Sequence, residues 1–137
     1  MVRVTRWTLT RRPIVAGLVS LMLAGGAASC GGGEDSSLSE LGKRGKDTAN
    51  ANGCASCHGA NGQGGVGPSW IDLAGSSREL TDGTTVVADD DYLLRAILEP
   101  EVEVVAGYSI RMPTNGLNED EASNVIRYIK ELTSDEA

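Results

Sequence analysis

Two cysteines and a histidine stand close together in the stretch Cys54-Ala55-Ser56-Cys57-His58. Cys-x-x-Cys-His is the pattern through which c-type haem is attached to a polypeptide. The spacing lets both thiols add to the vinyl groups on one side of the porphyrin, and the adjacent imidazole is then carried under the ring to the iron. The sequence therefore predicts one covalent haem c, with Cys54 and Cys57 as thioether residues and His58 as the proximal iron ligand.

Other interpretations of these cysteines and this histidine have less support in the sequence. A thioredoxin-like dithiol would need a βαβ setting, and a structural zinc site needs four ligands. The whole chain of 137 residues holds three Cys and one His. A disulfide between Cys54 and Cys57 would close a very short loop and constrain almost nothing. Haem attachment remains the favoured interpretation.

Met112 is the residue suited to the second axial position. Beyond residue 29, the chain holds one His, His58, and one Met, Met112, so ligation by two histidines of this chain is excluded there. A thioether is a soft ligand that favours Fe(II) and raises the reduction potential. Met112 could instead fill a gap in the core, but it lies in a polar stretch interrupted by Gly107, Pro113 and Gly116. We expect it to be the distal ligand.

The N-terminal 29 residues read as a secretory signal. Four Arg precede an apolar run over 13–24, which is too short for a comfortable membrane span and leads into small residues. Ala27-Ala28-Ser29-Cys30 resembles the lipobox of bacterial lipoproteins, so cleavage before Cys30 would leave that cysteine lipidated. The alternative is ordinary signal cleavage nearby, with Cys30 a free thiol. We expect an exported protein on the periplasmic side, tethered through Cys30, with the choice of inner or outer membrane open.

The charge balance limits the partners. The chain carries 12 Lys and Arg against 19 Asp and Glu. Four of the bases and none of the acids fall within residues 1–29, so the mature chain has a net charge of −11. Such acidity argues against nucleic acid and for a basic or weakly charged protein partner. Residues 30–38 read as a flexible Gly- and Ser-rich tether, and 39–137 as the folded domain.

The domain reads as helical with one hairpin. Helices are expected over 39–52, 90–98 and from Asn118 to about 132, where apolar residues recur at helical spacing behind a capping box. Asp82-Gly83 predicts a hairpin near 78–87, and the glycine-rich stretch 53–68 is expected to be a loop. With no Phe and 18 Gly, the core is thin, and a covalent apolar disc would fill it.

These motifs together resemble class I monohaem cytochrome c over residues 42–132. The likeness is narrower to the cytochrome c domain at the C-terminus of some bacterial cytochrome c oxidase subunits II, although the two Cys and two His of a copper domain are missing. The resemblance implies an all-α cytochrome c fold, with three to four helices around one haem. The segments that carry it are 52–68, 80–86, 92–100, and 105–113.

The same resemblance implies further haem contacts. The Pro68 carbonyl should accept a hydrogen bond from the His58 ring nitrogen that does not bind iron, which fixes the ring. Trp70 stands where the family usually has Leu and should close one haem edge, and Tyr108 should also contact the haem. Ala49 stands where the family usually has an aromatic residue, so the contact of the first helix with Tyr128 should be weaker than usual.

The expected function is single-electron transfer in a respiratory chain, by a protein that is not itself an enzyme. A six-coordinate iron without a second His disfavours a haem enzyme or gas sensor, which needs an open position. The alternative is a haem subunit permanently docked in a larger oxidoreductase or respiratory complex. The expected partners are redox proteins, such as a respiratory complex, a terminal oxidase or a dehydrogenase. We expect a monomer that meets the membrane through its lipid anchor alone.

Overall fold

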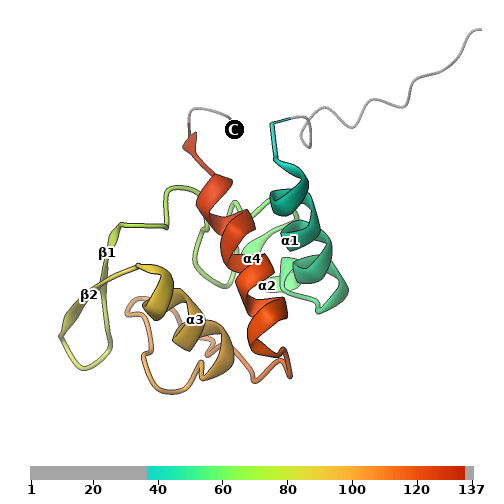
Figure 1. Ribbon diagram of the computed structural model, residues 1–137. Helices are drawn as coiled ribbons and strands as arrows, with labels where there is room; N and C mark the ends of the chain where they lie inside the picture. The colour runs from blue at the N-terminus through green and yellow to red at the C-terminus, as the bar shows by residue number, and fades with distance from the viewer. Residues whose placement is uncertain (1–36, 135–137) are drawn as a thin grey trace, which may run out of the picture. The chain divides into compact units, whose positions relative to one another are not determined.

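A computed structural model describes residues 37–134 of the chain. Its elements are α1 (Glu40–Ala51), α2 (Ala55–His58), β1 (Ser77–Glu79), β2 (Thr85–Val87), α3 (Asp90–Leu98) and α4 (Glu119–Glu131). Figure 1 shows α4 between α1 on one side and α3 on the other, with the small hairpin beyond α3. The predicted mostly helical fold with one hairpin is confirmed. The predicted signal peptide, Cys30 and most of the tether lie outside the described residues.

Side-chain caps explain where the long helices begin. The Ser39 side chain accepts a hydrogen bond from the N–H of Gly42 at 3.1 Å at the start of α1. Asp89 does the same for α3. At the start of α4, Asn118 and Glu121 form a reciprocal capping box with two bonds of 3.0 Å. Each cap satisfies backbone N–H groups that have no partner inside the helix, so the predicted helix starts hold within two residues.

One element was not predicted. The stretch 53–68, expected to be a loop, begins with the single-turn helix α2, which carries the cysteines and His58. Gly53, with φ of +76°, reverses the chain after α1, and the N–H of His58 then bonds to the carbonyl of Cys54 at 3.0 Å. Four residues are too few to show a helical period in the sequence. The rest of the stretch is loop, as expected.

Small residues bring α1 and α4 close together. Gly42, Gly45 and Ala49 are all buried on α1. A Cβ on Gly45 would lie 2.7 Å from the Cβ of Tyr128 and would overlap the backbone carbonyl of Asn124. Tyr128 is 2 % exposed and meets the Trp70 ring edge-on at 6.0 Å. The weaker contact expected from Ala49 therefore finds no support here, because close backbone approach takes the place of an aromatic side chain.

The hairpin is joined by backbone pairing to the segment that follows α3. β1 and β2 pair antiparallel with Ser77 opposite Val87, and the side chain of Asp82 accepts the N–H of Thr84 in the turn. Leu80 forms an isolated antiparallel bridge with Val105. Between residues 37 and 134, no helix has the length and apolar character needed to cross a membrane.

Candidate functional site

The turn of α2 presents both cysteines beside the core. Cys54 and Cys57 are half-buried free thiols, and no disulfide joins them. Burial raises the pKa of the Cys54 thiol above its ordinary value, a shift that a hydrogen bond with its own backbone opposes. The side chain of Cys54 packs against the hydrophobic core, whereas Cys57 lines a small surface cleft with Val66 and Met112.

The His58 ring is held in one orientation by two neighbours. Its Nδ1 lies 2.8 Å from the carbonyl oxygen of Pro68. Because a carbonyl only accepts, Nδ1 carries the proton and Nε2 keeps its lone pair. The indole of Trp70 stacks on the imidazole with ring centroids 4.6 Å apart. Burial lowers the pKa of His58, and the bond to Pro68 partly offsets this, so the ring is a neutral imidazole suited to metal ligation.

Glycines let the following loop close over His58. The N–H of Gly67 bonds to the carbonyl of Cys57 at 3.0 Å, and the N–H of Gly64 bonds to that of His58 at 2.7 Å. A Cβ on Gly67 would lie 3.1 Å from Cε1 of His58, and one on Gly65 would lie 2.9 Å from the Cys57 oxygen. The backbone of this loop thus packs directly against Cys57 and His58 and brings the Pro68 carbonyl to the imidazole.

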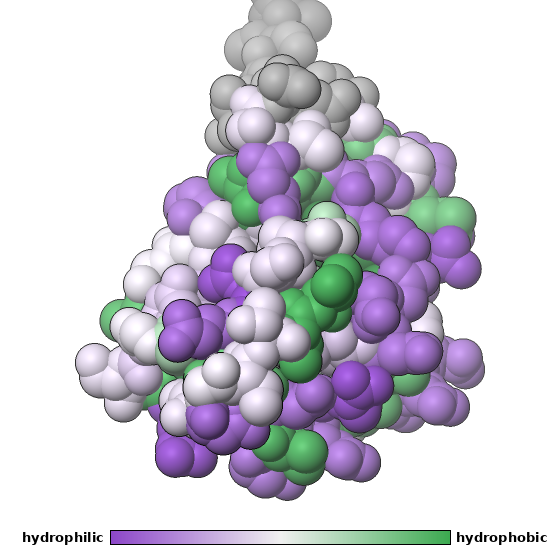
Figure 2. Space-filling model, turned by 90° about the vertical axis from the view of Figure 1, so that its left-hand side faces the viewer, coloured by the Kyte–Doolittle hydropathy of each residue, from purple (hydrophilic) through white to green (hydrophobic). Residues whose placement is uncertain are grey.

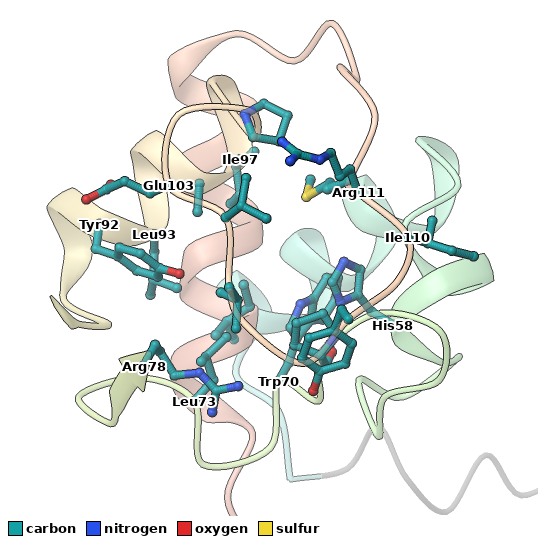
Figure 3. A pocket seen from close by; sticks show the side chains of 18 residues that line it. His58, Trp70, Leu73, Arg78, Tyr92, Leu93, Ile97, Glu103, Ile110 and Arg111 are labelled. Carbon is teal, nitrogen blue, oxygen red and sulfur yellow. The ribbon is translucent and has the colours of Figure 1, made fainter. Parts of the chain in front are cut away.

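His58 and Trp70 form one wall of a largely apolar cavity (Figure 3). The face in Figure 2 shows a group of hydrophobic side chains bordered by weakly and strongly hydrophilic ones. Arg111 lies across the cavity from His58 in Figure 3, and its neighbour Met112 also lines the cavity. Aliphatic and proline side chains from α3, α4 and the adjoining loops complete the lining, namely Pro68, Leu73, Leu93, Ala96, Ile97, Pro100, Val104, Val105, Ile110 and Ile129.

A polar group that the sequence analysis missed points into this cavity. Arg78 on β1 lines it, and its Nε is buried without a hydrogen-bond partner among the described residues. Tyr92 and Glu103 line the same side (Figure 3), and Glu103 is paired with Arg95 at 2.9 Å. Burial raises the pKa of Tyr92, while the charge of Arg78 opposes that rise. Nothing in the sequence distinguished Arg78 from an exposed hairpin residue, because its burial depends on the fold.

The cavity brings together five predicted site residues, namely His58, Pro68, Trp70, Tyr108 and Met112. Cys57 lines the adjoining cleft, whereas Cys54 packs against the core and lines neither. Trp70 is 6 % exposed, whereas Tyr108 is 37 % exposed although it also lines the cavity. Met112 is half-buried, which leaves its thioether within the cavity wall rather than in a packed core. Pro68 and His58 lie in both the cavity and the cleft that holds Cys57.

These features fit a haem. An apolar cavity suits the porphyrin faces, a neutral imidazole and a thioether suit iron, and the unpartnered Arg78 Nε suits an anionic carboxylate at the polar edge. A thioredoxin-like interpretation does not fit, because the sheet is a two-stranded antiparallel hairpin. Within residues 37–134, no three His, Cys, Asp or Glu side chains form a group that could hold a metal ion by themselves.

A small, mostly helical domain with a Cys-x-x-Cys-His turn beside an apolar cavity defines a c-type haem protein. The family model for cytochrome c matches residues 42–133, and the chain belongs to the cytochrome c family. No curated protein matched the chain in a sequence search. Membership identifies the cofactor as covalent haem c with its iron, and the general function as electron transfer with redox proteins.

Proposed function

We propose that this chain is an exported, membrane-tethered carrier of single electrons in a respiratory chain, with His58 and Met112 as the two axial ligands of its haem iron. The observation that carries the proposal is the Nδ1–Pro68 hydrogen bond of 2.8 Å, which leaves Nε2 of His58 as the free lone pair beside the cavity. Met112 is the sulfur-bearing residue of the cavity lining. Its thioether supplies the second ligand.

The haem contributes an iron that gains and loses one electron. The chain does the rest: Cys54 and Cys57 attach the ring, and Pro68 and Trp70 hold the His58 imidazole in place through both oxidation states. Arg78 offers its buried Nε to a carboxylate of the cofactor. The aliphatic lining excludes water, which keeps solvent reorganisation small. Among the residues that line the cavity, His58 is the one His, and a carrier is favoured over a haem enzyme that needs a distal base above an open iron position.

The surface around Cys57 is the proposed contact for the redox partner. Val66 and Ile110 are 51 % and 57 % exposed beside this cleft. No acidic side chain occurs in residues 53–71 or 104–118, and Arg111 is the one Arg or Lys in them. In an otherwise acidic chain, this weakly charged apolar area suits a protein surface of similar character. The likeness to the haem domain of oxidase subunits II supports a respiratory partner.

The tether is proposed from the sequence, since Cys30 lies outside the described residues. Cys30→Ser should move the haem protein from the membrane pellet to the soluble fraction with its spectrum unchanged. Ser36→Ala, in the same tether, is the matched control and should stay with the membranes. A wild-type protein that is already soluble would contradict tethering.

The carrier and a permanently docked subunit differ in what accompanies the protein. Native membranes solubilised from cells that carry a tag after Ala137 should yield the haem protein alone, with a reduced-minus-oxidised spectrum of c type. Stoichiometric copurification of respiratory subunits would overturn the free carrier. Absence of the c-type spectrum would overturn the haem assignment itself.

A further inference from the structure

The segment that presents Met112 is held to the rest of the domain by few hydrogen bonds. It runs from Gly107 to Leu117, between the Ala106 N–H, which bonds to the Glu79 carbonyl, and the capping box at Asn118. Apart from the turn at Ala106 and Gly107, positions 107–117 make no backbone–backbone hydrogen bond to another part of the described residues. Backbone geometry alone therefore does not fix the Met112 thioether.

One side chain supplies the hydrogen bond between this segment and a helix. The Nδ2 of Asn115 donates to the Ile97 carbonyl at 2.7 Å, and its Oδ1 accepts the N–H of Leu117 at 3.0 Å. Ile97 lies in the last turn of α3, where carbonyl groups have no partner within the helix. Its own side chain lines the cavity. The Asn115 amide thus links the Met112 segment directly to a wall of the cavity.

We propose that Asn115 is the positioning residue of the distal ligand: its amide holds the segment against the end of α3 so that the Met112 thioether stays at the iron. The inference rests on Met112 being that ligand. Asn115 is three residues beyond Met112, and Leu117 beyond it is buried. Loss of the amide would free the segment between Ala106 and Leu117, and also leave the Ile97 carbonyl and the Leu117 N–H without this partner.

The test measures how readily the sulfur ligand leaves the iron. In the reduced haem protein, carbon monoxide can bind only after Met112 departs, so its binding rate reports that departure. Asn115→Ala should raise the rate about tenfold, the equivalent of about 1.4 kcal/mol, and weaken the far-red absorption band of sulfur-bound ferric iron. Asn115→Asp is isosteric and keeps the contact with Leu117, but it loses the donor to Ile97, so it should show the same change.

The matched control is Asn52→Ala. It removes a side-chain amide that donates to a carbonyl near the end of α1, the bond to Thr48 at 2.8 Å, away from the Met112 segment. Its carbon monoxide rate and far-red band should equal those of the wild type. A reference variant, Met112→Ala, must lose the band; if it keeps the band, the ligand assignment fails. If Met112→Ala loses the band while both Asn115 variants match Asn52→Ala, the positioning role alone fails.

A measurement on the unaltered protein covers the case in which the Asn115 variants do not fold. Displacing Met112 from ferric iron with added cyanide should speed hydrogen exchange at the Leu117 N–H, because the segment that Asn115 anchors moves. Exchange at the Glu121 N–H, in the capping box next along the chain, should stay unchanged. Equal exchange at Leu117 with and without cyanide would overturn the proposal.

Discussion

The α1–α4 crossing and the Met112 segment lie in one small domain but are stabilised in opposite ways. At the crossing, Gly45 lets α4 approach to backbone contact, and Tyr128 is buried behind it. The side chain and N–H of Ser39 both donate to the Glu131 carboxylate, at 2.6 and 2.8 Å, which ties the start of α1 to the end of α4. The Met112 segment lacks comparable packing, and its Ile110 is 57 % exposed.

The difference separates what the polypeptide stabilises by itself from what depends on its cofactor. The contacts at the α1–α4 crossing are all made by the polypeptide itself. The segment borders an apolar cavity that a bound haem would fill, and its side chains would gain packing partners there. A bound haem and the proposed bond from Met112 to its iron should therefore contribute most of the order of residues 107–117, and little of the order of α1 and α4.

Removing the haem attachment should have the largest effect. Cys54→Ala combined with Cys57→Ala should abolish covalent haem and lower the free energy of unfolding by about 4 kcal/mol or more, the contribution of a ligand at a thousandfold its Kd. Most of the protein should then be unfolded by circular dichroism. Residual protection from hydrogen exchange should be confined to α1 and α4. Wild-type protection of the Leu117 N–H, which donates to Asn115, would contradict this difference between the two regions.

A large side chain at the α1–α4 crossing should instead disrupt the packing of these two helices and lower the stability of the domain. Gly45→Leu would overlap the Asn124 carbonyl, which is backbone and cannot turn aside. We expect a loss of about 3 kcal/mol in the free energy of unfolding, at the upper end for overpacking. Urea unfolding of the haem protein measures it. Asn50→Leu, at an exposed position of the same helix, should cost far less; equal losses would refute close packing as the cause.

Replacing Arg78 should change the reduction potential of the haem and leave the α1–α4 crossing intact. Arg78→Met removes a positive charge from the cavity, which disfavours the extra electron of the reduced state. The reduction potential should fall by roughly 60 mV, a tenfold change for one electron. Potentiometric titration measures this shift. Arg127→Met, at an exposed position on α4, should leave the potential unchanged, and an equal fall in both variants would reveal only a general charge effect.

The smallest effect is expected at the end of the crossing. Ser39→Ala removes both the α1 cap and one bond to Glu131, and should cost about 1 kcal/mol of stability. The reduction potential and the far-red band should not change. A shifted potential would show that the crossing and the ligand side are coupled after all.

The parts of the fold that were predictable have local signals. The capping box of α4, the Asp89 cap of α3 and the Asp82-Gly83 turn each specify structure within a few residues. The haem attachment residues were readable for the same reason, since their spacing is local. The Asn115–Ile97 bond joins positions 18 residues apart. The burial of Arg78 depends on a cavity that several elements form together. No pattern within one segment could indicate them.

We propose that His58 and Met112 together set the iron for electron transfer. Met112→His should keep two axial ligands while replacing a soft thioether by an imidazole, which stabilises Fe(III). The most direct measurement is the reduction potential of the two proteins side by side. We predict a fall on the order of 100 mV or more, with loss of the far-red sulfur band. An unchanged potential and band in Met112→His would contradict the assignment of Met112 as ligand.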